Sequence, residues 1–316
     1  MPQVAVSILN YNSAQSTIAC VQSLLSFDQA EGGAQLLEVF VADNASAESD
    51  RHHLQKTLVE LPNVHVQKNA ENMGFSAGHN RNLTAIFNHF NPDYVWVLNS
   101  DCLVYEDTLT ALIKCALQHV DVGIWGATLL ESDGETIQCG GGCFYNSWIS
   151  SFRQHGRGKS LSQIHQLKSA GFDYIAGASL FFPVETLRTG LRSAPQISGK
   201  STIDHQQWLN EVFFLYYEEL DLAQRLKPGL GMAWCKDALI RHAGGVSTGA
   251  SNRRRTAKAE YYSTLSALNY TQLYYPRQLW VMAPARYLAK FLQLFMKGEF
   301  RLLGSLTRAY RDFWSA

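Results

Sequence analysis

The sequence predicts an α/β fold with a mostly parallel central sheet flanked by helices, and three observations support this prediction. In the N-terminal third, short apolar runs rich in β-branched residues alternate with segments of helical periodicity. Strands and helices that alternate in this way form parallel sheets covered on both faces. The 316 residues, 46% apolar and 17% charged, are sufficient for a large core in one α/β domain with an appendage, or in two domains.

The N-terminal elements are predicted from their local patterns. The first strand, at residues 4–9, is a short β-branched run, and the helix that follows at residues 16–25 carries apolar residues at helical spacing. The other strands expected here lie at residues 36–41, 64–67 and 94–98, and the other helices at residues 78–90 and 108–118.

The middle of the chain is less regular. A strand is expected at residues 122–130, and the glycines at 140–142 indicate a turn or a close backbone approach. The polar segment 153–168 predicts a mobile loop. The remaining strands are expected at residues 174–182 (split by Gly177), 213–217, 232–235 and 238–241, with a helix over residues 222–226.

The C-terminal segment is predicted to be helical from about residue 255, with breaks at Pro276 and Pro284. It is also the basic part of the chain. The whole sequence has 27 Lys+Arg and 27 Asp+Glu, which argues against a dedicated nucleic-acid-binding protein. However, residues 251–316 hold eleven basic and three acidic residues, so this segment carries +8 and the first 250 residues carry −8. Such asymmetry indicates that the basic end contacts a membrane or a polyanion.

The lack of a recognisable targeting signal and the pattern of cysteines predict a cytoplasmic protein. No run of about 18 uncharged apolar residues occurs, so a membrane-spanning helix is not expected. The N-terminus has no basic stretch ahead of an apolar one, so a signal peptide is not expected either. The six cysteines are scattered, and Cys139 and Cys143 lack a second ligand pair for zinc, which favours free thiols in a reducing compartment.

Acidic residues follow three of the predicted strands. Asp43 comes after the strand at 36–41, Asp101 after the strand at 94–98, and the cluster Glu218-Glu219-x-Asp221 after residues 213–217. In open α/β sheets, ligands bind beyond the carboxyl ends of the strands. A single such Asp often caps the following helix instead, but three at successive strand ends indicate a shared site.

Two further segments indicate which kind of ligand this site would bind. Asn99-Ser100-Asp101 is an N-x-D element, and its carboxylate suits a Mg²⁺ or Mn²⁺ ion that bridges a diphosphate. Residues 72–80 contain two glycines, which allow the backbone to approach a ligand closely, and amide side chains that donate hydrogen bonds. Neither G-x-G-x-x-G nor G-x-x-x-x-G-K-[ST] occurs, which argues against a dinucleotide dehydrogenase and a P-loop NTPase.

Seven short segments lie within roughly residues 4–250. Each is a weak signal alone, but their combination and order are specific for one protein family. They are V-S-I-L-N-Y-N at 6–12, V-A-D-N-A-S at 41–46, N-M-G-F-S-A-G-H-N at 72–80, V-L-N-S-D at 97–101, A-G-A-S at 176–179, F-F-L-Y-Y-E-E-L-D-L at 213–222 and R-H-A-G-G-V-S at 241–247. This order resembles the family 2 inverting glycosyltransferases and, within them, the rhamnosyltransferase-like enzymes of bacterial cell-surface polysaccharide synthesis.

The resemblance implies a GT-A fold and a division of the chain. Residues 1–250 would form the catalytic domain, with a nucleotide-sugar-binding half at about 1–105 and an acceptor half at about 106–250. Residues 251–316 would form a basic, amphipathic helical extension.

The resemblance also implies a donor site for a nucleotide sugar. Asp43 would hydrogen-bond the base of a pyrimidine nucleotide, and Asn10 and Asn12 would border the nucleotide. The residues expected to line the nucleotide and the donor sugar are Asn72, Gly74 and Asn80.

A divalent cation, Mn²⁺ or Mg²⁺, is implied by the same resemblance. Asp101 matches the metal-binding end of the family's D-x-D element, in which Asn99 replaces the first Asp. His242 matches a histidine that completes the metal coordination in several members, and the alternative is a histidine satisfied within a loop.

The acidic cluster is the expected source of the catalytic base. An inverting transfer needs a carboxylate that takes the proton of the acceptor hydroxyl. The family usually has Glu-Asp here with the Asp as base, so Glu219 stands at the position of the base. Since Glu is one methylene longer, Glu218 or Asp221 is the alternative base, although Asp221 fits a supporting or helix-starting role better.

The basic end has two expected roles. The run Arg253-Arg254-Arg255 would form a lid that grips the donor diphosphate or an anionic acceptor, with Arg254 as the residue expected at the donor, and a solvated charge run is the alternative. Over residues 280–314, apolar side chains interleave with Lys and Arg. This pattern fits either an anionic membrane surface or a helical tail packed on the catalytic domain or on a second subunit, as in a homodimer.

Three functions are therefore compared. The first is an inverting glycosyltransferase that moves L-rhamnose from dTDP-rhamnose, or else a hexose from a UDP-hexose, to a hydroxyl of a lipid-linked saccharide. Its place would be the cytoplasm or the cytoplasmic face of the inner membrane. The second is a nucleotidyltransferase, whose Gly- and Arg-rich phosphate loop is missing from the sequence. The third is a non-catalytic protein that binds nucleotide sugars or polysaccharide on the same scaffold.

Overall fold

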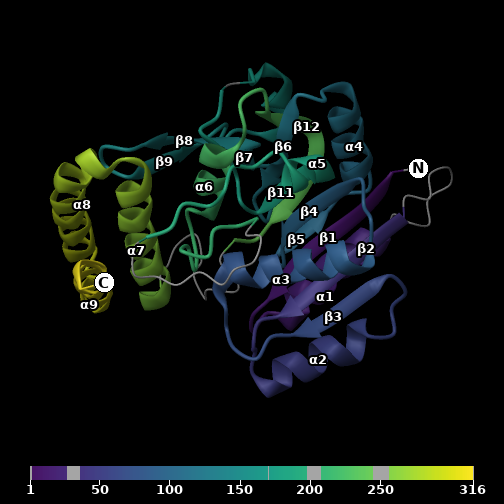
Figure 1. Cartoon of the computed structure of the whole chain (residues 1–316), viewed down its shortest axis with the longest axis horizontal. Coiled ribbons are helices and arrows are strands. Elements are labelled where there is room, and N and C mark those ends of the chain that lie inside the picture. Colours follow the sequence, from purple (N-terminus) through teal and green to yellow (C-terminus); the bar gives the residue numbers. More distant parts are fainter. Residues whose placement is uncertain (1, 27–35, 170, 198–207, 245–255, 316) are drawn as a thin grey trace.

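The computed structural model describes residues 2–26, 36–169, 171–197, 208–244 and 256–315 (Figure 1). Its main feature is a nine-stranded sheet in the order β3-β2-β1-β4-β11-β6-β12-β5, with β7 paired to β6. One half of the sheet consists of β1 (Gln3–Asn10), β2 (Leu36–Asp43), β3 (Val64–Lys68) and β4 (Tyr94–Asn99), all paired in parallel. Each of these strands agrees with its predicted range to within two residues at either end.

Helices cover both faces of this half because both faces of its strands are apolar. Val4, Val6 and Ile8 of β1 pack in one core cluster with α1 (Ala14–Leu25), α2 (Glu48–Leu58) and α4 (Thr108–Gln118). Ala5 lies in the other core cluster, together with residues of α3 (Gly74–His89). Successive residues of a strand point to opposite faces, which explains this division.

The other half of the sheet mixes parallel and antiparallel pairs. It consists of β5 (Cys102–Val104), β6 (Val122–Leu130), β7 (Ile137–Gly140), β11 (Ser179–Pro183) and β12 (Gly231–His242). β11 runs antiparallel to β4 and β6, β12 runs parallel to β6, and β5 runs antiparallel to β12. The predicted α/β class is confirmed, and parallel pairing predominates in the N-terminal half of the sheet. The pairing of β12 with β5 places His242 opposite Cys102.

Smaller elements lie beside this sheet. A three-stranded antiparallel sheet has the order β10-β8-β9 and consists of β8 (Gly142–Asn146), β9 (Ser151–Gln154) and β10 (Tyr174–Ile175). The short helices of this region are η1 (Leu161–Gln166), α5 (Val184–Arg188) and α6 (Glu218–Arg225).

Three helices form the C-terminal part of the chain, on the left in Figure 1: α7 (Ala257–Tyr274), α8 (Pro276–Met296) and α9 (Phe300–Trp314). Tyr270 of α7 is fully buried and packs against Phe213 and Tyr217, so α7 shares the core of the α/β part. α8 and α9 pack on α7 through smaller apolar clusters. Among the described residues, no helix is long and apolar enough to cross a membrane.

One predicted strand is wrong, and two others form a single strand. Residues 213–217 form bends, because Tyr216 and Tyr217 have φ angles of 70° and 75°, in the left-handed region. The acidic cluster therefore starts α6 and does not follow a strand. Residues 232–235 and 238–241, predicted as two strands, belong to the single strand β12, whose pairing with β6 is irregular between Cys235 and Leu239.

The helix and loop boundaries also differ from the predictions at three places. α3 begins at Gly74, four residues before the predicted start at residue 78. Segment 153–168, predicted as a mobile loop, contains the end of β9 and the helix η1, which a capping box at Ser160 stabilises. Pro276 starts α8 as expected, but Pro284 lies inside α8 on its exposed side, where water can reach the carbonyl that loses its helical donor.

Candidate active site

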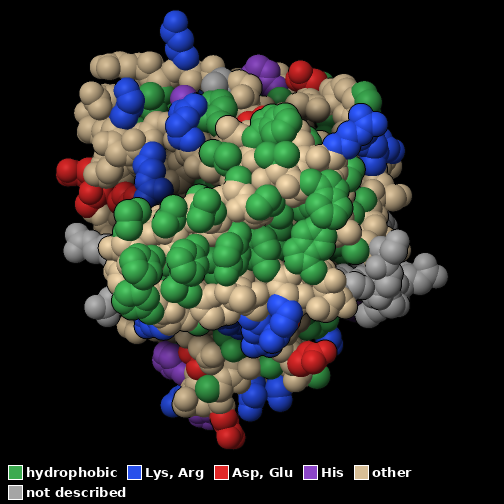
Figure 2. All heavy atoms as spheres, turned by 90° about the vertical axis from the view of Figure 1, so that its left-hand side faces the viewer, with side chains coloured by type: hydrophobic (Ala, Val, Ile, Leu, Met, Phe, Trp, Pro, Cys, Tyr) green, Lys and Arg blue, Asp and Glu red, His purple; other side chains and the backbone are tan. Residues whose placement is uncertain are grey.

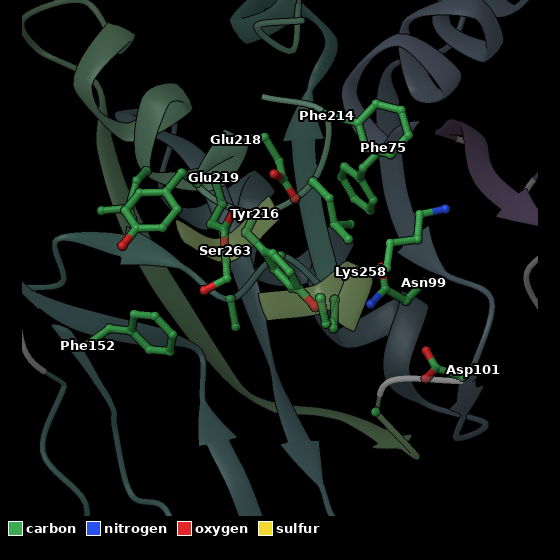
Figure 3. Close-up of a pocket in the computed structure, with 18 of the residues that line it drawn as sticks. Phe75, Asn99, Asp101, Phe152, Phe214, Tyr216, Glu218, Glu219, Lys258 and Ser263 are labelled. Carbon is green, nitrogen blue, oxygen red and sulfur yellow. The ribbon is translucent and has the colours of Figure 1, made fainter. Parts of the chain in front are cut away.

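A cavity of about 630 Å³ opens where the carboxyl ends of β1 and β4 meet the first turns of α3, α6 and α7 (Figure 3). This volume is typical of sites for small organic ligands. Figure 3 shows Glu218 and Glu219 on one side of the cavity and Asn99 and Asp101 across from them. The place of the cavity agrees with the expectation that ligands bind beyond the carboxyl ends of the strands.

Asn72 and Gly74, both predicted for the donor site, lie on the wall of the cavity. They are held by Asn44, whose side-chain amide donates to the Oδ1 of Asn72 at 3.1 Å and to the carbonyl oxygen of Gly74 at 3.0 Å. Gly74 has a φ of +80°, and a Cβ here would lie 2.4 Å from the carbonyl oxygen of Phe214. Only glycine fits this position without a shift of the backbone.

Asp43 and Asn10 lie behind the wall of the cavity and not on it. Both are fully buried, and the Nδ2 of Asn10 donates to the Oδ1 of Asp43 at 2.9 Å and to Asp50 at 3.0 Å. Asn12 is exposed, and its Oδ1 accepts from the amide of Ala47 at 2.8 Å. These predicted residues shape the loops after β1 and β2, and it is Asn44, next to Asp43, that reaches the cavity.

Asn80 also lies away from the cavity wall. Its side chain donates to the carbonyl oxygen of Leu209 at 2.8 Å and accepts from the amide of the same residue at 2.9 Å. This pair of hydrogen bonds fastens the segment before α6 to α3. The structure therefore gives Asn80 an indirect position, as an anchor for the chain that carries Glu218 and Glu219.

Asp101, between β4 and β5, and His242, at the end of β12, are brought together. The Nε2 of His242 lies 3.2 Å from the Oδ1 of Asp101 and 3.4 Å from the Nδ2 of Asn99. The Nδ1 of His242 lies 2.7 Å from the Oε1 of Gln138, an acceptor, so Nδ1 donates to Gln138 and Nε2 is the nitrogen that faces Asp101. A histidine whose second nitrogen is oriented in this way is typical of a metal ligand.

Cys102 is the third group near this pair, since one ligand atom each of Asp101, Cys102 and His242 lie within 4.8 Å of one another. Burial and the neighbouring charge of Asp101 raise the pKa of the Cys102 thiol well above its usual value. The thiol therefore stays protonated, whereas thiolates are the form that binds metals. Of the two donors that remain, a carboxylate and an imidazole, the carboxylate is the one that suits Mn²⁺ or Mg²⁺.

Glu218 and Glu219 start α6 and reach the cavity after the two tyrosines with positive φ. The Oε2 atoms of both glutamates are buried without a hydrogen-bond partner among the described residues. Burial raises the pKa of Glu219 to about 7, although backbone amides at the start of α6 partly offset it. Burial, and then the charge of Glu219, raise the pKa of Glu218 well above its usual value.

The segment around Gly177 packs against the second glutamate. A Cβ on Gly177 would lie 3.5 Å from the Cδ of Glu219, and residues 176–178 line the cavity beside it.

Asp221, the third candidate base, does not line the cavity. It is fully buried, and its Oδ2 pairs with the Nε of Arg225 at 2.6 Å. Its Oδ1 accepts from the hydroxyl of Tyr274 at 2.7 Å and from Asn210 at 3.0 Å. These contacts join α6 to α7, which agrees with a supporting role and leaves no path to a ligand in the cavity.

Two residues on the wall were missed by the sequence reasoning. Lys258 in α7 lies 4.5 Å from the ring centre of Tyr11 and 5.7 Å from that of Phe214, and all three line the cavity. His79 lines it too, and burial lowers its pKa to about 3, so its ring is neutral. Lys258 is one of the eleven basic residues of segment 251–316, but no local pattern distinguishes it from the others. His79 lies within the motif at residues 72–80, which is the signal that could have identified it. Arg254 lies outside the described residues.

The comparisons with known proteins agree with this geometry. Residues 5–184 match the sequence profile described as Glycosyl transferase family 2. None of the curated proteins matches the chain in sequence.

Similar solved structures include TarS 1–349 of S. aureus in complex with UDP-GlcNAc, at 13% identity and a TM-score of 0.53, over 98% of this chain and 80% of that one. Another is the mannosyltransferase PcManGT of Pyrobaculum calidifontis in complex with GDP-Man and Mn²⁺, at 15% identity and a TM-score of 0.48. The latter match covers 99% of this chain and 87% of that chain. At these identities, the likeness to TarS concerns the fold alone.

Proposed function

We infer the function from one premise: the chain belongs to glycosyl transferase family 2, whose profile matches more than half of its length, and it has the GT-A fold. It is a glycosyltransferase. We propose that it is an inverting, metal-dependent enzyme in which residues 1–250 form the catalytic domain and residues 251–316 a C-terminal extension.

One observation carries this proposal. Two carboxyl groups with raised pKa values, those of Glu218 and Glu219, stand across a single cavity from the Asp101–His242 pair. A base on one side and an ion-binding pair on the other are the two requirements of a direct displacement at an anomeric carbon.

Glu219 is the base in this proposal. With a pKa of about 7, its carboxylate is populated at neutral pH and is basic enough to take the proton of an acceptor hydroxyl. Burial and the charge of Glu219 raise the pKa of Glu218 well above its usual value, which favours the protonated form of Glu218 beside the Glu219 carboxylate. The hydroxyl oxygen then forms the bond to the anomeric carbon as the bond to the nucleoside diphosphate breaks, with inversion at that carbon.

Asp101 and His242 would hold the divalent cation, and Gln138 orients the imidazole. The cation, when bound, neutralises charge that develops on the departing diphosphate. Asn72 and Gly74 would lie beside the donor on the wall of the cavity, and Lys258 supplies a positive charge.

The finer assignments extend the sequence resemblance. The donor proposed first is dTDP-rhamnose, and the alternative is a UDP-hexose. The acceptor proposed is a hydroxyl of a lipid-linked saccharide in cell-surface polysaccharide synthesis, at the cytoplasmic face of the membrane.

A thermal-shift panel tests the donor and the metal together. We expect one of dTDP-rhamnose and UDP-GlcNAc to raise the melting temperature, and to raise it more with Mn²⁺ present. Release of the nucleoside diphosphate with that donor, and its loss in Asp101→Ala, would support the proposal. Binding that is indifferent to Mn²⁺, or an Asp101→Ala protein with normal turnover, would contradict the metal assignment.

A further inference from the structure

The two faces of α8 differ from the pattern expected of a helix on a protein surface. Its inner face, with Leu279, Met282 and Leu294, is buried against α7 and α9. Its outer face carries Val281, Leu288, Leu292 and Phe295, which are between 47% and 59% exposed. Figure 2 shows these helices from outside, with hydrophobic side chains gathered in a continuous band.

The spacing shows that this is one face and not a scatter of exposed residues. Residues 281, 288, 292 and 295 are separated by seven, four and three positions, which places them on one side of a helix over four turns. By contrast, the outer face of α2 consists of His52, His53, Gln55 and Lys56. Contiguous exposed apolar surface of this kind marks an interaction site.

The ends of the face and a neighbouring turn enlarge it. Trp280 is 73% exposed and stacks on Trp314 of α9, with ring centres 5.6 Å apart. The turn between β8 and β9 presents Trp148 and Ile149, both more than half exposed. This turn is fastened to α8, because Arg286 donates from Nη1 to the carbonyl oxygen of Ser150 at 2.7 Å.

A rim of positive charge borders this face. The segment 276–314 has seven basic and two acidic residues. Both acids, Glu299 and Asp312, are already paired with arginines of α9. The exposed basic residues of the rim are Arg277, Lys297, Arg301, Arg308 and Arg311. An apolar centre with a basic border complements a surface that is apolar inside and anionic outside.

The same charge argues against a second copy of the chain as the occupant. In a two-fold symmetric contact, each copy offers the same patch, so the basic rim of one copy would face the basic rim of the other. Like charges opposed in this way disfavour the contact. Exposed tryptophans at the ends of the face fit the headgroup region of a bilayer, where this side chain is enriched.

The cavity extends to the same helices. Lys290 and Gln293 of α8 line it, together with Lys297, Glu299 and Leu302. We propose that the outer face of α8, with the β8–β9 turn and the Trp280–Trp314 pair, lies in the headgroup region of an anionic lipid bilayer. Bound in this way, the protein would have the α8 side of its cavity at the bilayer surface, from which a lipid-linked acceptor arrives. In that last respect the inference rests on the proposed function, whereas the binding itself does not.

Vesicle co-sedimentation of the full-length protein tests the inference without any donor or acceptor. The probes are vesicles of phosphatidylcholine mixed with phosphatidylglycerol and vesicles of phosphatidylcholine alone. The variant is the double change Leu288→Gln and Leu292→Gln, and the control is Leu117→Gln, an exposed leucine of α4 at 63% exposure. All three leucines are exposed, so the melting temperatures should match that of the unchanged protein.

We expect binding to the anionic vesicles that weakens at high salt. We expect binding roughly tenfold weaker for each leucine replaced on α8, from the apolar area that no longer enters the bilayer, and unchanged binding for Leu117→Gln. Equal binding by the double variant, or no binding to either vesicle, would overturn the inference. So would a dimer in light scattering that the double variant splits. None of these results alters the transfer assay with a short soluble acceptor, so a failure here is distinct from a failure of the proposed function.

Discussion

Replacement of Glu219 by glutamine tests the proposed base and the electrostatics of its site in one variant. Glutamine keeps the size of the side chain and removes its charge. If Glu219 takes the proton of the acceptor hydroxyl, kcat should fall on the order of 10²- to 10⁴-fold, the usual contribution of a general base. The affinity for the donor should change little, because Glu219 lies across the cavity from Asn99 and Asp101.

The same variant should gain stability, and the structure gives the sign and the size of the gain. Burial raises the pKa of Glu219 from its usual 4.5 to about 7. Between these two pH values the unfolded chain is ionised and the folded protein is not, so the free energy of unfolding falls as pH rises. At about 1.4 kcal/mol per pH unit, the loss is about 3 kcal/mol once the pH exceeds 7. Glutamine, which does not ionise, avoids this loss.

Two measurements separate these effects. Urea denaturation at pH 4 and at pH 8 should give similar free energies of unfolding for the two proteins at pH 4, and a higher value for Glu219→Gln at pH 8. The pH profile of kcat for the unchanged enzyme should rise through about pH 7, because the base acts in its ionised form. The control is Glu185→Gln on α5, a glutamate whose side chain is 68% exposed.

Either measurement can refute the reasoning. Transfer by Glu219→Gln within a few-fold of normal would move the base to Glu218. A stability difference that does not change between pH 4 and pH 8 would show that burial does not hold Glu219 in its protonated form. A loss of stability at pH 8 would mean that the carboxylate has a structural partner, which the described contacts do not include.

The remaining predictions concern the ion-binding pair and the cavity wall. Asp101→Ala should remove the Mn²⁺-dependent rise in melting temperature and abolish transfer, while far-UV circular dichroism stays unchanged; a full Mn²⁺ response would exclude Asp101 as a ligand. Gln138→Leu should weaken Mn²⁺ binding roughly 10- to 100-fold in calorimetric titration, because His242 loses the acceptor that orients it. Gly74→Ala should lower the free energy of unfolding by about 2 kcal/mol or more, since its Cβ would meet the carbonyl oxygen of Phe214 at a φ of +80°; an unchanged denaturation midpoint would contradict this.

The elements predicted best from the sequence are those whose pattern is local. β1, β2, β3 and β4 are apolar runs bounded by polar loops, and they appear within two residues of the predicted ends. The errors occur where contacts between distant segments decide the backbone. Residues 213–217 have the composition of a strand, but the φ angles of Tyr216 and Tyr217 turn the chain so that Glu218 and Glu219 enter the cavity.

The candidate site was predicted in part. Asn72, Gly74, Asn99, Asp101, Glu218, Glu219 and His242 line one cavity, as the motifs indicated. Asn10, Asn12, Asp43, Asn80 and Asp221 do not, because each is engaged in hydrogen bonds behind the wall or outside it. Asp43 and Asn44 are neighbours in sequence, but Asn44 lines the cavity and Asp43 lies behind its wall. Only the direction of each side chain at the end of β2 separates the two.

The sequence by itself determined the family, the parallel half of the sheet and the basic character of the C-terminal segment, because these depend on the types of residues and their local order. The tertiary structure decided which residues meet. Asn99 and His242, 143 positions apart, come within 3.4 Å because β12 pairs with β5. It also decided which face of α8 is covered. The periodicity of a helix with apolar residues on both sides does not show which side packs, and the contacts with α7 and α9 bury one side and leave the other exposed.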